Sequence, residues 1–241
     1  MFFGGNVEDM EMTPKHSKQI QADQAVRLIK DGDVLMVGGF GLTGSPLALI
    51  DALCRTPVKN LTIISNNMGE PGKGLGKLVL AKKVRKAIGS FFTSNPDVIR
   101  SYQSGEVELE LLPQGTLAEA IRAGGAGLGG IYVKAGVGTE LAKGKETRVI
   151  NGQTYLFQPS LTADVALIKA YRADRLGNLV YRKSARNFNP LMAMAAKLVI
   201  AEVEEVVEVG GLSPEEIVTP HLFVDYFVVH EKPAGGTRHG R

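Results

Sequence analysis

The chain has 241 residues, a formal net charge of +3 and a single cysteine, Cys54. Its composition, 44% hydrophobic and 22% charged, is typical of a folded globular protein and excludes intrinsic disorder for most of the chain. One cysteine excludes a disulfide framework and a cysteine-rich metal site, and the small, dispersed charge argues against nucleic-acid binding. The chain has neither an apolar run of membrane-spanning length nor a signal-peptide pattern, so the sequence favours a cytoplasmic protein without a membrane partner.

The two ends of the chain differ in composition from its interior. Residues 1–16 show no periodicity, and residues 232–241 are rich in glycine and basic residues. We therefore expect a flexible N-terminal extension and a flexible tail around one continuous domain at 17–231.

Short apolar strands alternate with amphipathic helices through that domain. Helical spacing of apolar residues predicts a helix at 20–30, and the continuous apolar run at 34–37 predicts a strand covered on both faces. A glycine-rich turn follows, after which Ser45 and Pro46 are typical of the N-cap and first position of a helix. Further strands are predicted at 61–64, 107–112, 165–170, 198–201 and 224–229, and further helices at 78–88, 116–123 and 190–196.

This alternation predicts an α/β fold with a mainly parallel open sheet and helices on both faces. Because ligands of such sheets bind beyond the carboxyl ends of the strands, the residues that follow each strand are the candidates for a site.

The turn after the first strand carries the pattern G-x-G-x-x-G at Gly39, Gly41 and Gly44. Such a turn lets a phosphate approach backbone N–H groups at the start of a helix, but it is equally typical of a tight turn that binds nothing. A nicotinamide dinucleotide would also require an acidic residue at the end of the second strand. That strand ends instead in Ser65, Asn66 and Asn67.

The amides of Asn66 and Asn67 donate N–H hydrogen bonds, which suit an oxyanion or a thioester carbonyl. Two asparagines before a glycine are, however, more often turn residues, and the pattern alone favours that interpretation. Gln114 follows the strand predicted at 107–112 and brings a third amide to the same edge, or begins the turn into the next helix.

Four other features carry weaker signals. Residues 72–77 lack the spacing of a phosphate-binding loop and are predicted to be a flexible basic loop. The glycine cluster at 124–130 follows a helix, so we expect a mobile or closely packed loop that could line a site. Residues 184–190 are interpreted as a structural loop rather than an anion site. The four histidines are scattered without metal-ligand spacing, so no metal site is expected.

Eight segments, taken in order, resemble family I coenzyme A transferases, specifically the A (alpha) subunit of the 3-oxoacid and acetate/acetoacetate type. They are DGDVLMVGGFGLTGSP (31–46), SNN (65–67), LPQGTL (112–117), RAGGAG (122–127), GVGT (136–139), ADRLGN (173–178), ARNFNP (185–190) and TP (219–220).

The resemblance implies a Rossmann-like transferase fold and an enzyme that moves CoA from a short-chain acyl-CoA to a 3-oxoacid or short-chain carboxylate. Such chemistry belongs to ketone-body and short-chain fatty-acid metabolism. It implies a ping-pong route through a glutamyl-CoA thioester on a partner B subunit, so the nucleophile is not expected in this chain. The implied assembly is an A2B2 heterotetramer, and the CoA thioester is its substrate rather than a permanently bound cofactor.

The resemblance also assigns roles to individual residues. It implies CoA binding by the segment that comprises Gly38, Gly39, Phe40, Gly41, Leu42, Thr43 and Gly44. It places the amides of Asn66, Asn67 and Gln114 beside the reacting acyl group, with Asn66 at the position where the B subunit has its glutamate. A NAD-binding oxidoreductase domain, based on the glycine pattern alone, is the alternative.

Overall fold

The computed structural model describes residues 18–230. The extension expected at 1–16 and the tail expected at 232–241 therefore lie outside the described residues.

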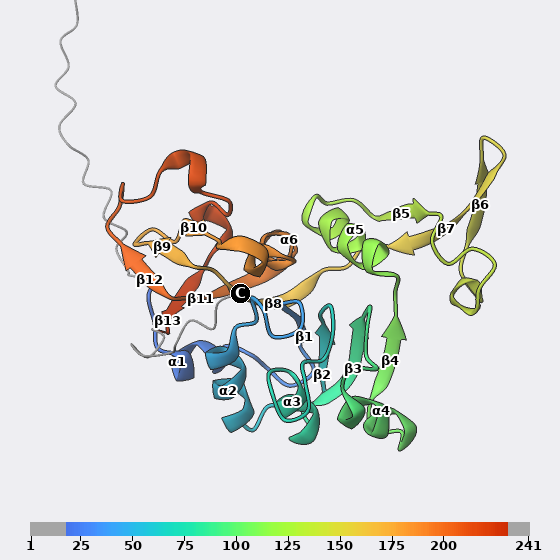
Figure 1. Cartoon of the computed structure of the whole chain (residues 1–241), viewed down its shortest axis with the longest axis horizontal. Helices are drawn as coiled ribbons and strands as arrows, with labels where there is room; N and C mark the ends of the chain where they lie inside the picture. Colours follow the sequence, from blue (N-terminus) through green and yellow to red (C-terminus); the bar gives the residue numbers. More distant parts are fainter. Residues whose placement is uncertain (1–17, 231–241) are drawn as a thin grey trace, which may run out of the picture.

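Seven parallel strands form the central sheet, in the order β13-β11-β8-β1-β2-β3-β4 (Figure 1). They are β1 (Val34–Val37), β2 (Leu61–Ile64), β3 (Val84–Gly89), β4 (Glu108–Leu111), β8 (Ala163–Lys169), β11 (Ala196–Val203) and β13 (Tyr226–Val229). The chain builds the sheet from β1 to β4 and then returns to pair β8 with the other side of β1. The topological switch point, where open α/β sheets bind ligands, therefore lies beside β1.

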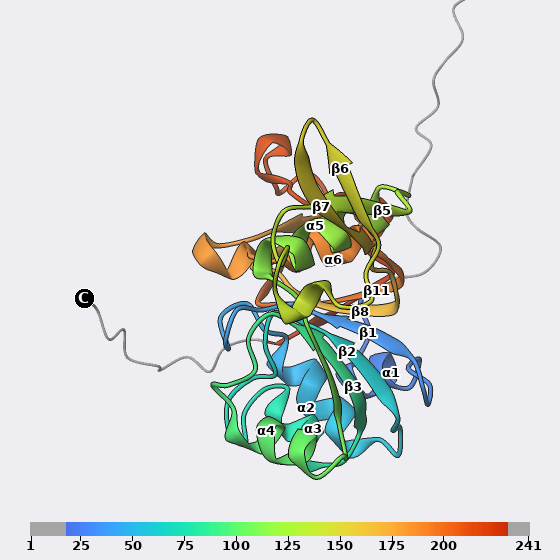
Figure 2. The ribbon, with the colours of Figure 1, turned by 90° about the vertical axis from the view of Figure 1, so that its right-hand side faces the viewer.

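Helices cover both faces of this sheet, which confirms the predicted α/β architecture (Figures 1 and 2). One face carries α1 (Ala22–Val26), α2 (Leu47–Arg55), α3 (Gly76–Leu80) and α4 (Pro96–Gln103), and the other carries α5 (Gln114–Gly125) and α6 (Asn189–Met194). Side chains alternate between the two cores along each strand, as the strand period of two requires. In β1, Leu35 and Val37 belong to the core beneath α1–α4, whereas Met36 belongs to the core beneath α5 and α6.

Two small sheets accompany the main one, and the sequence analysis predicted neither. The antiparallel sheet β5-β7-β6 contains β5 (Gly130–Val133), β6 (Thr147–Ile150) and β7 (Gln153–Pro159), and it extends away from the body on the α5 side (Figure 1). The sheet β10-β9-β12 contains β9 (Arg172–Asp174), β10 (Leu179–Val180) and β12 (Glu205–Val207). Within residues 18–230, four 3-10 helices lie in the connections: Glu140–Ala142, Lys183–Arg186, Pro214–Glu216 and His221–Phe223.

Residues 78–88 do not form the basic helix that the sequence indicated. They contain the end of α3 and most of β3, separated by Lys82, whose φ of 53° ends the helix. The basic residues of the strand are paired across the sheet: the Lys86 ammonium lies 2.8 Å from the Glu110 carboxylate and 3.1 Å from the Glu108 carboxylate of β4. The hydrogen bond that the Lys86 ammonium donates to the Glu110 carboxylate is the main cause of a raised pKa of Lys86, so the charge of Lys86 is retained at neutral pH. Charge in this segment was therefore a sign of cross-strand pairing rather than of an exposed helix.

Among residues 18–230, no helix combines the length and the apolar character that a membrane crossing requires.

Candidate active site

The glycine-rich segment after β1 forms a tight turn at the switch point. Phe40 and Thr43 exchange backbone hydrogen bonds of 2.9 and 3.2 Å, so the two residues between them form the tip of a miniature hairpin. Gly41, at that tip, has a φ of +62° and nothing within 4 Å of the position that a Cβ would occupy. Glycine is therefore required by the backbone conformation, while the space beside it stays open.

The rest of this turn is fixed by residues 184–190. The Asn187 side chain accepts a hydrogen bond from the Gly39 N–H (3.2 Å) and donates one to the Thr43 carbonyl (3.0 Å). Asn189 donates to the Gly44 carbonyl at 3.0 Å, and its Oδ1 lies 1.8 Å from the position of a Gly38 Cβ. The predicted structural role of this loop is confirmed. A side chain at Gly38 is excluded by Asn189 rather than by a ligand.

The N-terminus of α2 is not a free anion site. The Glu202 carboxylate, which is 0% exposed, accepts hydrogen bonds from the N–H groups of Ala48 (2.8 Å) and Leu49 (3.2 Å). Its other oxygen lies 2.8 Å from the Lys169 ammonium, which balances the buried charge. The helix begins at Leu47 with Pro46 as its N-cap, so the prediction that Ser45 would be the N-cap was wrong; Glu202 does the capping from another strand.

A cavity of about 420 Å³ lies at the carboxyl edge of β1, β2 and β3. Its lining residues are Phe40, Gly41, Asn66, Asn67, Glu70, Ser90, Phe91, Ser94 and Gln114. The structure thus brings five of the predicted site residues to one cavity. The other predicted residues do not line it: Gly38, Gly39 and Gly44 are buried, Thr43 is exposed, and the Leu42 side chain packs beside Gly74.

The amides at this cavity still have donor groups to offer. Asn67 is only 7% exposed, yet within residues 18–230 its side chain makes no hydrogen bond. Asn66 is 3% exposed; its Oδ1 accepts from the Ser90 hydroxyl at 2.9 Å, and its Nδ2 has no partner in the described chain. Gln114 is exposed and begins α5, whose N-cap, Pro113, supplies no capping side chain. These donor groups reach the accessible surface of the cavity, so they are available for hydrogen bonds to a polar ligand.

The cavity also contains a carboxylate that the sequence analysis missed. Glu70 begins a second miniature hairpin, in which Glu70 and Lys73 exchange backbone hydrogen bonds of 3.2 and 2.9 Å. Its carboxylate is about half exposed and lies 3.7 Å from the Lys73 ammonium. Residues 72–77, predicted as a flexible loop, are therefore part of this tight turn and the start of α3. The two turns share the pattern G-x-x-x-x-G, at 39–44 and at 69–74, and this repeat was a signal available in the sequence.

The second glycine cluster lies away from the cavity and serves packing. A Cβ on Gly124 would lie 2.0 Å from the Leu161 carbonyl, and one on Gly125 would lie 2.8 Å from the Met194 Cβ. Gly124 lets the end of α5 approach the connection between β7 and β8, and Gly125 lets it approach α6, so of the two predicted alternatives the closely packed one is correct at these positions.

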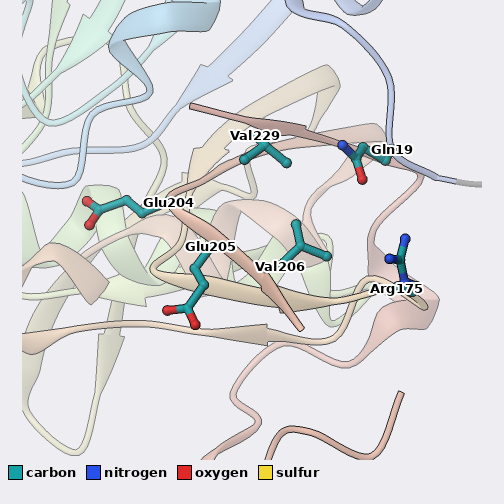
Figure 3. Close-up of a pocket in the computed structure, with 6 residues that line it drawn as sticks. All are labelled: Gln19, Arg175, Glu204, Glu205, Val206 and Val229. Carbon is teal, nitrogen blue, oxygen red and sulfur yellow. The ribbon is translucent and has the colours of Figure 1, made fainter. Parts of the chain in front are cut away.

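A larger cavity, of about 600 Å³, lies near β12 and the ends of β11 and β13 and contains none of the predicted residues (Figure 3). It is lined by Gln19, Arg175, Glu204, Glu205, Val206 and Val229. Figure 3 shows the carboxylates of Glu204 and Glu205 turned away from the Arg175 guanidinium. Arg175 is paired instead with Glu208 at 2.8 Å. The smaller cavity, with its unpaired amides, is therefore the better candidate for an active site.

Comparison with known proteins shows what the whole chain is similar to. The family model described as coenzyme A transferase matches residues 19–230. The chain is 51% identical over 206 residues to the A subunit of the probable succinyl-CoA:3-ketoacid coenzyme A transferase of Bacillus subtilis strain 168, covering 86% of this chain and 87% of that protein. It is 52% identical over 206 residues to the A subunit of the 3-oxoadipate CoA-transferase of Pseudomonas putida, covering 85% and 89% of the two chains.

The fold is also that of a solved acyl-CoA transferase from Escherichia coli O157:H7, crystallised as a thioester complex with CoA. The TM-score is 0.80 and the identity 23%, and the match covers 93% of this chain. It covers 49% of the longer chain, so the present protein spans about half of the length of that transferase.

Proposed function

The chain belongs to the coenzyme A transferase family, and on that premise we propose that its carboxyl-edge cavity binds the reacting acyl group of a CoA thioester. The chain is the A subunit of a CoA-transferase of the 3-oxoacid type. The alternative of a NAD-binding oxidoreductase domain is not supported, because the relatives are transferases and β2 ends in amides rather than in an acid. The proposed reaction moves CoA from a short-chain acyl-CoA to a 3-oxoacid or other short-chain carboxylate.

One observation carries the proposal: three side-chain amides, from Asn66, Asn67 and Gln114, line the same cavity as the open tip of the glycine turn. They come from the ends of two strands, β2 and β4, that are separated in the sheet only by β3. Amide N–H groups stabilise negative charge on an oxygen without themselves taking part in proton transfer.

The reaction requires such donors because charge moves onto oxygen. A carboxylate that attacks the thioester carbonyl forms a C–O bond, and the carbonyl electron pair moves onto its oxygen before the CoA thiolate leaves. The developing oxyanion is best stabilised by donors that are already in place and screened from water. We assign this role to Asn67 and Gln114, with Asn66 beside them, and assign the approach of the CoA thioester to the turn at Gly41.

The attacking carboxylate is proposed to come from a B subunit, in an A2B2 assembly. The relatives are named as one subunit of a transferase, which supports a partner chain. Asn66 is a carboxamide and cannot form an acyl anhydride or a thioester in place of a glutamate. The cavity of this chain then supplies binding and charge stabilisation, and its partner supplies the covalent step.

The amides can be tested in the complex with the B subunit. We expect Asn67→Ala and Gln114→Ala to lower kcat by about 10²–10³, the usual cost of one oxyanion donor. The KM should change little, because these hydrogen bonds strengthen only as charge develops. Asn67→Asp should be worse, since a carboxylate there repels both the oxyanion and the attacking glutamate. The measurement is steady-state CoA transfer, with thermal melts of each variant.

Gln103→Ala provides the matched control, because Gln103 is an exposed glutamine at the far end of α4. It should leave kcat and the melting temperature unchanged. Full activity of Asn67→Ala and Gln114→Ala would remove both amides from the site. A lowered melting temperature with normal kcat would show that they only stabilise their turns.

A further inference from the structure

Ser90 directly follows β3, and within residues 18–230 all of its hydrogen bonds go to a single neighbour, Asn66. The Ser90 N–H donates to the Asn66 carbonyl at 3.0 Å, and the Ser90 hydroxyl lies 3.1 Å from the same carbonyl. The hydroxyl also lies 2.9 Å from the Asn66 Oδ1. Both residues line the cavity, at the ends of neighbouring strands.

The contact between the two side chains places the Oδ1 end of the Asn66 amide against Ser90. The amide has an acceptor end, Oδ1, and a donor end, Nδ2, which are nearly equal in shape. In the structure the Ser90 hydroxyl donates to Oδ1, and the Nδ2 hydrogens have no partner in the described chain. Rotation of the amide by 180° would turn Oδ1 toward the cavity, where it would repel a developing oxyanion.

The backbone around this contact is held independently of the hydroxyl. The Asn66 carbonyl also accepts a hydrogen bond from the Phe91 N–H at 3.2 Å. A Cβ on Gly89 would lie 2.6 Å from the Ser65 carbonyl, so the end of β3 packs tightly against the end of β2. Removing the Ser90 hydroxyl therefore leaves two backbone hydrogen bonds to Asn66 and changes chiefly the freedom of its amide.

We propose that Ser90 is a positioning residue that fixes the Asn66 carboxamide with its N–H groups toward the reacting acyl oxygen; this rests on the function proposed above. Ser90 itself does not touch the reacting atoms. Its effect is transmitted through Asn66, so the two residues act as a unit, and their substitutions must be strongly non-additive.

The test compares Ser90→Ala, Ser90→Thr and Asn66→Ala in the complex with the B subunit. We expect Ser90→Ala to lower kcat about tenfold with little change in KM, a smaller loss than that of a deleted donor because part of the population keeps the correct orientation. Ser90→Thr keeps the hydroxyl and should restore most of the activity. The double variant Ser90→Ala/Asn66→Ala should be no slower than Asn66→Ala alone.

Ser104→Ala is the matched control, because it also deletes a serine hydroxyl that donates to a backbone carbonyl, that of Ser101 at 3.1 Å, on the exposed end of α4. It should leave kcat unchanged. The positioning role alone would be overturned if the wild-type complex is active and Ser90→Ala has a normal kcat. It would also be overturned if the losses of kcat in Ser90→Ala and Asn66→Ala multiply in full in the double variant. A wild-type complex that transfers no CoA would overturn the proposed function, and this role with it.

Discussion

Three glycines of one short turn are required for two kinds of physical reason, crowding at Gly38 and Gly44 and a left-handed backbone at Gly41 and Gly44. Gly38 leaves room for the Asn189 side chain, and Gly44 leaves room for the Ala185 carbonyl, which lies 2.4 Å from a Cβ built there. Gly41 has no neighbour of this kind and a φ of +62°. A pattern match treats these glycines as equivalent, whereas only Gly41 has open space for a ligand.

Gly41→Val should therefore weaken use of the acyl-CoA. The branched side chain would fill the approach to the cavity, and the left-handed backbone conformation would cost about 1–2 kcal/mol of stability. We expect kcat/KM for the acyl-CoA to fall about tenfold or more, as a loss of roughly 1.4 kcal/mol gives. The measurement is initial-rate kinetics of the complex at several acyl-CoA concentrations.

Gly105→Val separates the two effects of that substitution. Gly105 has a φ of +76° and equally open surroundings, but it lies in the loop between α4 and β4. It should share the loss of stability and leave kcat/KM of the folded protein intact. Equal kinetic losses in both variants would contradict a role for Gly41 in the approach of CoA.

Among the described residues that line the cavity, Glu70 is the single charged one. A carboxylate there disfavours an acyl group that carries a second carboxylate, such as succinyl. We expect Glu70→Gln to raise kcat/KM for succinate relative to acetate by about threefold to tenfold, the effect of roughly 1 kcal/mol of screened repulsion. High salt should reduce this difference.

Glu119→Gln is the control, because Glu119 is also about half exposed and paired with a basic residue, Arg122, three positions along the chain. It should leave the ratio of the two substrates unchanged. If Glu70→Gln abolished transfer of every acyl group, Glu70 would itself be the nucleophile, and the assignment of the covalent step to a partner would be wrong.

Some of the site could be predicted from the sequence because its residues directly follow strong strand signals. Asn66, Asn67 and Gln114 come after apolar or alternating runs, and the parallel sheet brings such positions together. Ser90 and Phe91 could not be found in this way, because the basic residues before them predict a helix where the structure has β3. Glu202 caps a helix 153 residues away in sequence, a contact that no local pattern indicates.

At the scale of elements, the start of β1 is fixed to β8 by one side chain. The Asp164 carboxylate accepts a hydrogen bond from the Val34 N–H at 3.0 Å and from the Lys197 ammonium at 2.9 Å. The Val34 hydrogen bond, followed by that of Lys197, holds the pKa of Asp164 below its ordinary value of 3.8. The strands that border the switch point are thus joined by a contact that depends on an ionised carboxylate.

The stability of this junction should depend on pH in one direction. A carboxylate with a lowered pKa in the folded state contributes its full stability above the unfolded pKa and loses it as pH falls through the folded pKa. Asp164→Asn should therefore lower the free energy of unfolding at pH 7, and the difference from wild type should shrink below pH 3.8. Urea denaturation of both proteins at a series of pH values measures this difference.

Asp23→Asn serves as the comparison, because Asp23 forms only an exposed pair with Arg55. Such pairs contribute little to stability, so this variant should unfold like the wild type at each pH. A difference between Asp164→Asn and wild type that stays constant down to pH 2 would show that the charge of Asp164 contributes nothing.

At the same scale, elements with a single clear period were predictable and those with mixed signals were not. The apolar runs of β1, β2 and β8 were found because burial on both faces leaves no other interpretation of their composition. The two small sheets contain strands without such a signal: every residue of β6 is exposed, and β10 has only two residues. Their stability comes from pairing with neighbours rather than from a pattern within the strand.

At the scale of the whole molecule, the cavity is open and its rim is apolar. The side chains of Phe40 and Phe91 are 51% and 54% exposed, although both line the cavity. A site that must stabilise an oxyanion works best when water is excluded. We therefore expect the partner subunit to cover this rim when it brings its carboxylate to the amides.

The most direct test of the proposed partnership is CoA transfer measured with the purified chain, with the purified B subunit, and with the two mixed. The chain holds the amides and the glycine turn but, in our proposal, not the nucleophile. We predict transfer from an acyl-CoA to acetoacetate or acetate only in the mixture. Transfer at a comparable rate by this chain alone, free of B subunit, would contradict the proposal that the covalent step belongs to the partner.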